Sequence, residues 1–135
     1  KEIKHEATTS SEESAKARGT SIEQGAKALL MFADSNPVLL VLSAAKKLDN
    51  SAFKKQFSFK DLKMASAEEV EKISGVQIGG VPPFGNLFNV PVYVDKSLLN
   101  ENEIAFNAGS REKSIIMKSS DFKKLVNPQL GQYSL

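Results

Sequence analysis

Apolar residues occur along this chain in short runs, which predict strands of a packed sheet. The clearest is the continuous run at residues 38–42, which is typical of a buried strand. A second apolar run at residues 26–33 precedes it, and the polar residues 34–37 between the two are turn formers. Two apolar runs joined by a short polar turn predict a β-hairpin. Further strands are expected at residues 3–6, 90–94, 103–107 and 114–117.

Two Ser-x-x-Glu patterns predict the starts of helices, since each matches a capping box. Ser10 and Glu13 would open a helix that ends at Gly19, and Ser66 and Glu69 one that ends at Gly75. Two more helices are expected at residues 44–53 and 121–126. Short strands with hairpin-length connections predict a mixed α/β fold in one domain, residues 1–135, rather than a doubly wound parallel sheet.

The composition is that of an ordinary soluble domain, 41% hydrophobic and 25% charged. The absence of cysteine excludes a disulfide scaffold, thiolate-bound metal and a cysteine nucleophile. The longest apolar run is about ten residues, against roughly 20 needed to span a bilayer, and no apolar leader is visible. We therefore expect a cytoplasmic protein with no membrane partner. Because the chain opens with Lys1 rather than Met, we also expect a trimmed N-terminus.

Charge is distributed unevenly although the net charge is only +2. Residues 46–63 carry a net +4 and residues 111–135 a net +3, whereas residues 1–45 carry −1 and residues 64–110 carry −4. The two basic blocks could form one face that meets a phosphate backbone. The alternative is two solvated surfaces unrelated in space.

Several mechanisms lack the residues they need. There is no Gly-x-Ser-x-Gly elbow, and a Ser-His-Asp triad would depend on His5, the only histidine. No cluster of histidines has metal-ligand spacing, and neither common phosphate-binding glycine motif is present. We expect no metal and no cofactor.

Three segments could carry chemistry instead. Lys27 interrupts an apolar run, so it is either a cation in a pocket or a lysine whose stem lies along a half-exposed strand. Gly79 and Gly80 start a loop stiffened by two prolines, which is either a preorganised set of N–H donors or a rigid structural turn. The small residues 107–110 at a strand end could line a cleft or form an ordinary turn.

Together these segments resemble the YbaK/ProX family of aminoacyl-tRNA deacylases, the editing domains associated with prolyl-tRNA synthetase. Residues 25–29 are similar to the segment with the family's characteristic lysine, and residues 79–85 to its Gly-x-x-x-Pro loop. Residues 91–95 resemble the strand that ends in Asp, residues 106–110 the small-residue strand end, and residues 5–10 the early segment. The family usually has an extra N-terminal helix that this chain lacks.

The resemblance implies a mixed α/β fold with a partly barrelled sheet, flanking helices and a central cleft. It also implies hydrolysis of the ester between a wrong amino acid and the 3′ end of tRNA, by water or the ribose 2′-hydroxyl. Expected partners are the charged acceptor end of tRNA and prolyl-tRNA synthetase, with the protein a monomer. The two basic blocks would contact the acceptor stem.

Site residues follow from the same resemblance. The implied catalytic residues are Lys27, Gly79 and Gly80. The implied substrate-binding residues are Pro82, Pro83, Phe84, Gly85, Asn107, Ala108, Gly109 and Ser110. Lys27 would bind the terminal phosphate or the ester, and the loop would limit the size of the aminoacyl group.

The expected substrate is tRNA for proline carrying Ala, Cys, Ser or Thr, and a tight loop at Pro82 and Phe84 favours a small residue such as alanine. Pocket contacts separate such groups by only about 1–3 kcal/mol. Two alternatives stay open: a non-catalytic tRNA- or synthetase-binding module of the same fold, and a domain that binds a small nucleotide in the same cleft.

Overall fold

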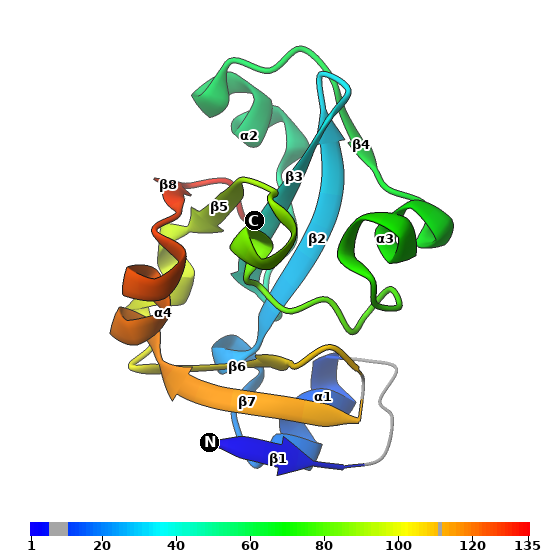
Figure 1. Cartoon of the computed structure of the whole chain (residues 1–135). Coiled ribbons are helices and arrows are strands. Elements are labelled where there is room, and N and C mark those ends of the chain that lie inside the picture. The colour runs from blue at the N-terminus through cyan, green and yellow to red at the C-terminus, as the bar shows by residue number, and fades with distance from the viewer. Residues whose placement is uncertain (6–10, 111) are drawn as a thin grey trace.

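Two β-sheets with surrounding helices form the protein, as a computed structural model of residues 1–5, 11–110 and 112–135 shows (Figure 1). The strands of the described residues are β1 (Glu2–Lys4), β2 (Ala26–Ala33), β3 (Asn36–Ser43), β4 (Leu62–Met64), β5 (Val92–Asp95), β6 (Glu103–Asn107), β7 (Lys113–Lys118) and β8 (Gln129–Gly131). The α-helices are α1 (Ser11–Arg18), α2 (Asn50–Phe57), α3 (Ala67–Ser74) and α4 (Ser119–Val126). Short 3-10 turns occupy Ile22–Gln24, Gly85–Phe88 and Lys96–Asn100.

The larger sheet has the strand order β4-β2-β3-β5-β8, and the smaller has β1-β7-β6. Strand β3 runs antiparallel to β2 and parallel to β5, so the predicted mixed α/β fold is confirmed. In the described ranges, one bridge, between Gly25 and Ala105, links the two sheets, and the sheets do not close into a barrel.

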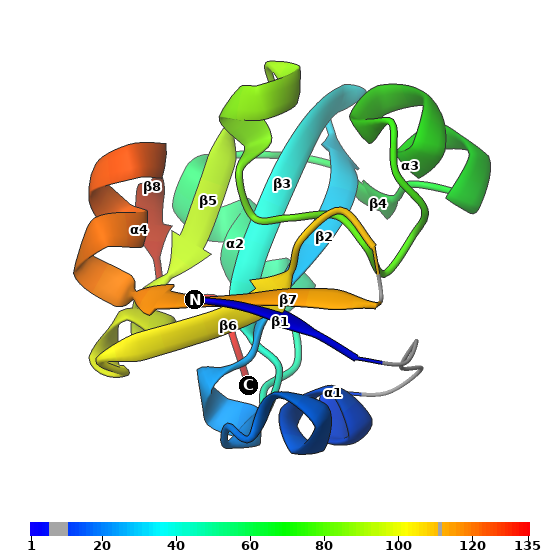
Figure 2. The same ribbon diagram turned by 60° about the horizontal axis from the view of Figure 1, so that its bottom comes forward.

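Side chains of the larger sheet alternate between two apolar layers. Leu39 and Val41 pack on the face that meets the smaller sheet, α3 and α4. Leu40 and Leu42 pack on the opposite face, with Phe53 of α2 and Tyr93 of β5. Figure 2 shows α2 behind the larger sheet and the smaller sheet crossing in front. This two-sided burial explains why β3 is a continuous apolar run without alternation.

The predicted hairpin is present, but its turn is shorter than residues 34–37. Only Asp34 and Ser35 lie outside the strands, with φ of 47° and 70°. Positive φ at both central residues matches the twist of a two-residue hairpin. Pro37 pairs with Phe32 inside the ladder. The Asp34 carboxylate accepts the backbone N–H of Asp61 at 2.8 Å, which ties this turn to the start of β4.

The helix predicted at residues 44–53 is wrong in its first half. Helix α2 begins at Asn50, and Asp49 caps it by accepting the N–H of Ala52 at 3.1 Å. The preceding segment instead pairs with the C-terminus: the N–H of Leu135 donates to the carbonyl of Lys47 at 2.7 Å, and the N–H of Asp49 to that of Tyr133 at 2.7 Å. A long-range pairing thus replaces the local helix.

The other predicted helices can be compared with their observed ends. The capping box of Ser66 and Glu69 is present, with bonds of 2.9 and 3.1 Å, and α3 stops at Gly75 with φ of 79°. Helix α4 begins at Ser119, within a residue or two of its predicted start. The capping box at Ser10 lies outside the described residues. Strands β4 and β8, of three residues each, were not predicted. Among the described residues, no helix is long and apolar enough to cross a membrane.

A buried carboxylate holds the end of β5 to the C-terminal segment. Asp95 is only 2% exposed and accepts the backbone N–H of Tyr133 at 2.7 Å, the hydroxyl of Ser134 at 2.9 Å, and both the N–H and the hydroxyl of Ser97. The buried Tyr133 hydroxyl lies 2.9 and 2.7 Å from the carbonyl oxygens of Val41 and Tyr93, which share its one proton. Burial alone would raise the pKa of Asp95, but the hydrogen bonds together outweigh it and lower the pKa.

We expect Asp95→Asn to lower the free energy of unfolding at pH 7 by about 1–3 kcal/mol, because buried donors lose their acceptor. The Asp95 pKa is lower in the folded protein, so its contribution to stability is present above the ordinary pKa and is lost as pH falls through the folded value. Urea denaturation between pH 7 and pH 3 should therefore show a steeper loss in the wild type than in the variant.

The control is Ser134→Ala, which removes one of the several hydrogen bonds to Asp95 and should cost less than Asp95→Asn. Equal stability of wild type and Asp95→Asn across this pH range would contradict the structural role of the carboxylate.

Candidate functional site

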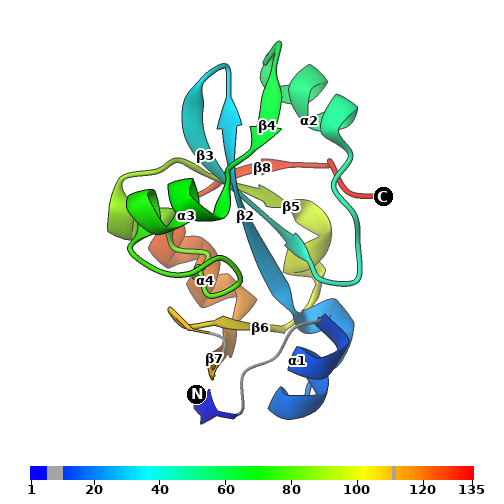
Figure 3. The ribbon, with the colours of Figure 1, turned by 90° about the vertical axis from the view of Figure 1, so that its right-hand side faces the viewer.

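A cleft of about 330 Å³ runs along the edge of β2 and is lined by residues of α1 and α3 among others. Figure 3 shows how α1 and α3 are placed along β2. The wall of the cleft includes six consecutive residues, 25–30. Side chains of a strand alternate between faces, so six residues in a row line a cleft only when it follows the strand's edge. The remaining lining comes from α1, the ends of β3 and β4, α3, the glycine loop and the end of β6: Ser14, Arg18, Ala44, Met64, Ala65, Val70, Ile78, Gly79, Val81 and Asn107.

Lys27 lies at the α1 end of this cleft and is half-buried. Its Nζ donates to the carbonyl of Lys46, in the segment between β3 and α2. Burial, and then the charge of Lys47, lower the pKa of Lys27. An ammonium has three N–H donors, of which Lys46 accepts one, so Lys27 can also bind an anion. The structure thus favours the interpretation of Lys27 as a cation in a pocket.

Arg18, which we did not predict as a site residue, is a second cation at the same end. Its Nε donates to the Ser114 hydroxyl at 2.7 Å and its Nη2 to the Asn107 side-chain oxygen at 2.9 Å. Burial lowers the pKa of Arg18. Among the described residues, no carboxylate lies within ion-pair distance of Arg18 or Lys27. Nothing in the sequence around Arg18 distinguishes it from a solvated residue at the end of a helix.

Asn107 connects this arginine to the glycine loop. Its side-chain NH₂ donates to the carbonyl of Gly79, while its oxygen accepts from Arg18. The amide is therefore fixed in one orientation by two partners. Asn107 was predicted from the strand end and Gly79 from the loop, and the structure brings both into the cleft of Lys27.

The Gly79–Gly80 turn leans closely on the strand end after β6. The N–H of Gly80 donates to the carbonyl of Gln77 at 2.9 Å. The carbonyl of Gly80 accepts the N–H of Gly109, also at 2.9 Å. A Cβ on Gly80 would lie 3.0 Å from the Cα of Ser110. The Gly80 N–H is thus engaged within the turn, whereas Gly79, at φ of 87°, lines the cleft.

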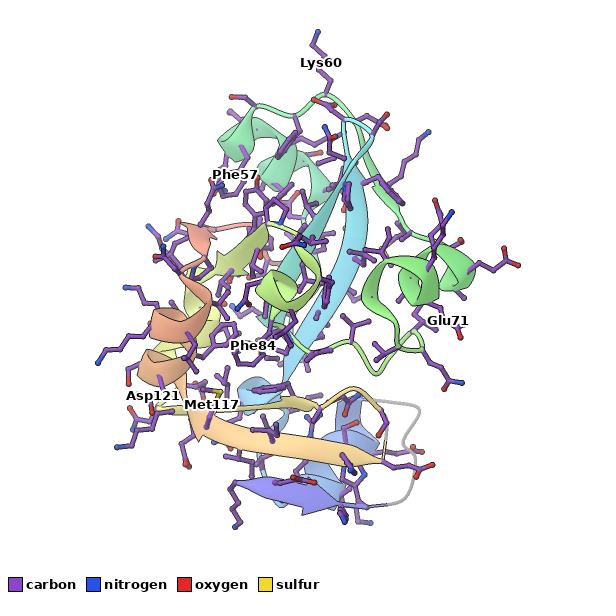
Figure 4. The ribbon with its side chains drawn as sticks, in the orientation of Figure 1. Phe57, Lys60, Glu71, Phe84, Met117 and Asp121 are labelled. Carbon is purple, nitrogen blue, oxygen red and sulfur yellow. The ribbon has the colours of Figure 1, made fainter. Side chains whose placement is uncertain are left out.

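Four predicted substrate-binding residues lie on a different pocket of about 380 Å³: Pro82, Phe84, Ala108 and Gly109. Its lining is mostly apolar. Phe84, labelled in Figure 4, packs on Phe106 and Phe122, with ring centroids 5.5 and 5.6 Å from its own. Pro83, Gly85 and Ser110 line neither pocket. The loop residues thus divide between two pockets, and Pro82 and Phe84 line the second pocket rather than the cleft that holds Lys27.

In the part of the chain that the structure describes, His5 and Ser114 do not form a hydrolytic pair open to the cleft. His5 Nε2 lies 2.8 Å from the Ser114 hydroxyl, but Ser114 is fully buried and also accepts from Arg18. A buried hydroxyl cannot reach an ester carbonyl. The described residues contain no group of three His, Asp or Glu side chains that could hold a metal ion.

The two basic blocks are not equivalent in position. Lys46 and Lys47 begin the first block beside Lys27. Helix α4, which carries Lys123 and Lys124, lies on the opposite side of the molecule from α3 (Figure 1). Lys60 extends from the far end of the molecule (Figure 4). Among the described basic residues of the two blocks, Lys46 and Lys47 are the ones that lie beside Lys27 of the cleft.

The family model of the aminoacyl-tRNA editing domain matches residues 5–125. The chain belongs to this family. It is 34% identical over 136 residues to the multifunctional Ser/Thr-tRNA deacylase ProXp-y of Escherichia coli K12, covering 97% of this chain and 81% of that protein. It is 29% identical over 98 residues to the proline–tRNA ligase of Caldicellulosiruptor bescii, covering 72% of this chain and 17% of the ligase.

Among solved structures of the editing family, a candidate trans-editing enzyme for prolyl tRNA synthetase superposes with a TM-score of 0.90 at 27% identity, covering 100% of this chain and 86% of that one. Membership of the editing family confirms the predicted resemblance and the predicted enzyme class, an aminoacyl-tRNA deacylase. The individual roles of the site residues stay predictions.

We expect Gly80→Ala to lower the free energy of unfolding by about 1–3 kcal/mol, because the new Cβ would meet the backbone of Ser110 at 3.0 Å, which cannot rotate away. Thermal or urea denaturation measures this. Gln77→Ala is the control, since its side chain is exposed, and should stay within about 0.5 kcal/mol of wild type. If Gly80→Ala were as stable as wild type, the loop would not be held against the strand end.

Proposed function

We propose that this editing domain hydrolyses the ester that joins serine or threonine, wrongly attached, to the 3′-terminal adenosine of tRNA. The amino acids come from the Ser/Thr-tRNA deacylase that the chain resembles over nearly its whole length. The observation that carries the proposal is the pair of cations, Lys27 and Arg18, that faces one cleft without a carboxylate among the described residues. Such a site is complementary to a phosphate and to the negative charge that develops on an ester oxygen.

The cleft supplies electrostatics and positioning rather than proton transfer. Its described lining contains no Asp, Glu or His. We therefore assign the attack to a water molecule oriented by the ribose 2′-hydroxyl of the substrate. Water adds to the ester carbonyl carbon, the bond to the ribose oxygen breaks, and a proton from the water passes to that oxygen. Lys27 would stabilise the carbonyl oxygen as it becomes negative, and the low local polarity of a half-buried site strengthens that attraction.

The distribution of charged and apolar residues along the cleft sets the orientation of the substrate. Lys27, Lys46 and Lys47 lie together at one end of the cleft, where the phosphates of the acceptor end would be attracted. The other end is apolar, with Leu30, Val70 and Val81. We propose that the tRNA end enters from the lysines and that the amino acid lies further along β2.

A panel of charged tRNAs tests the substrate. We expect faster deacylation of seryl- and threonyl-tRNA than of alanyl-, cysteinyl- or prolyl-tRNA, each measured on tRNA for proline and on one other tRNA. A preference for alanine on tRNA for proline alone would instead support the expectation from the loop sequence. Binding of tRNA without turnover of any substrate would favour a non-catalytic module.

We expect Lys27→Ala to keep the fold and lose about 100-fold or more of kcat/KM, because one preorganised donor is worth about that much at a developing oxyanion. Lys27→Arg should also be impaired, since a planar fork replaces a compact ammonium. Because the Lys27 pKa is lowered, wild-type activity should decline with rising pH earlier than an ordinary lysine would cause. Lys55→Ala on α2, an exposed lysine, is the control. Normal turnover by Lys27→Ala would remove Lys27 from the mechanism.

A further inference from the structure

Strand β2 is paired along its whole length on one side and only at its end on the other. Strand β3 pairs with it from Ala26 to Ala33, whereas β4 pairs with it only from Met31 to Ala33. Among the described residues, no strand covers the second side between Gly25, which bridges to Ala105, and Met31. This uncovered stretch of edge forms one wall of the cleft.

Two hydrogen bonds fix which residues of β2 direct their backbone groups into the cleft. The carbonyl of Gly25 accepts from Ala44, which follows β3, so odd-numbered residues point toward β3. The carbonyl of Leu30 accepts from Ala65, at the end of β4, so even-numbered residues point to the other side. In an antiparallel ladder the N–H and C=O of one residue point the same way. Both backbone groups of Ala28 therefore face the cleft.

We infer that the aminoacyl group docks on this edge as a one-residue strand, exchanging two hydrogen bonds with Ala28. The N–H of Ala28 would donate to the ester carbonyl, and the C=O of Ala28 would accept from the α-ammonium group. This is the pattern of a hydrogen-bonded pair in an antiparallel sheet, for which an amino acid already has the correct spacing. The inference rests on the proposed function and deepens it.

Charge supports this orientation. Within a residue the N–H lies toward the preceding residue and the C=O toward the following one, so the ester carbonyl would lie on the Lys27 side of Ala28. Arg18 lies at the same end, since a Cβ added to Gly25 would be 3.7 Å from the Arg18 Nη1 atom. The two cations thus stand near the oxygen that becomes negative, and the α-ammonium lies away from them, toward Leu30.

The docking mode defines a substrate class. Neither hydrogen bond involves the amino-acid side chain, so the side chain is selected by the walls of the cleft alone. The α-ammonium, by contrast, must be unblocked, because an acyl group on it would remove the charge and fill the space against β2. Esters of N-acylated amino acids, such as peptidyl-tRNA, would be excluded from this site.

The test measures binding of a non-hydrolysable analogue, adenosine with serine joined to its 3′ position through an amide. We expect Ala28→Pro to weaken binding about tenfold or more, because proline lacks the N–H. The pairing with β3 should survive, since that N–H points away from β3, and Lys27 already has the extended conformation that a following proline requires. Ala28→Gly keeps the N–H and is the matched control.

A second arm keeps the wild-type chain and changes the ligand. The N-acetylated analogue should bind about tenfold or more weakly than the one with an unblocked amine. This arm decides the question if Ala28→Pro proves to be unfolded by circular dichroism. Equal affinity of both analogues for the wild type would overturn the inference, as would wild-type affinity of a folded Ala28→Pro.

Turnover of seryl-tRNA, measured in parallel, separates this inference from the proposed function. Amine-dependent binding without turnover of any charged tRNA would support the docking mode and contradict the proposed function. Turnover of seryl-tRNA by a folded Ala28→Pro at the wild-type rate would keep the proposed function and overturn the docking mode.

Discussion

The ladder between β2 and β3 is the constraint on which the rest of the molecule depends. It places eight residues of β2 beside a strand that is buried on both faces, so β2 cannot shift without exposing the core. Strand β3 thereby pairs with one side of β2 along its whole length, and the short β4 pairs with only the end of the other side. The cleft exists because this second side is left unpaired within a rigid sheet.

Around that edge, the groups of the site are held by contacts between distant parts of the chain. Arg18 from α1 bonds Ser114 of β7 and Asn107 of β6, and Asn107 bonds the loop at Gly79. Lys27 bonds the segment after β3. The cations are thus oriented before any substrate arrives, which is what electrostatic stabilisation of a transition state requires.

Elements that are determined by residues close together in the sequence could be predicted from the sequence. The apolar runs of the hairpin and the capping box at Ser66 and Glu69 depend on neighbouring residues, and both are present. The helix expected from residue 44 failed because residues 47 and 49 pair with the C-terminus, which no local pattern reveals. Lys27 was visible as a charge in an apolar run. Arg18 was not, because its importance comes only from where α1 packs. The loop at residues 79–85 was seen as one feature, yet its residues divide between two pockets.

The walls of the cleft also bear on how this protein behaves at high concentration. An unpaired strand edge is a template on which a second chain can add a strand, and proteins that expose one tend to self-associate. Here α3 and the segment around Ile78 and Gly79 stand beside the uncovered part of β2. A cleft of about 330 Å³ admits a ligand of a few residues' size but not a long strand of another molecule. The same walls that limit the size of the substrate therefore also keep a second chain from adding a strand to β2.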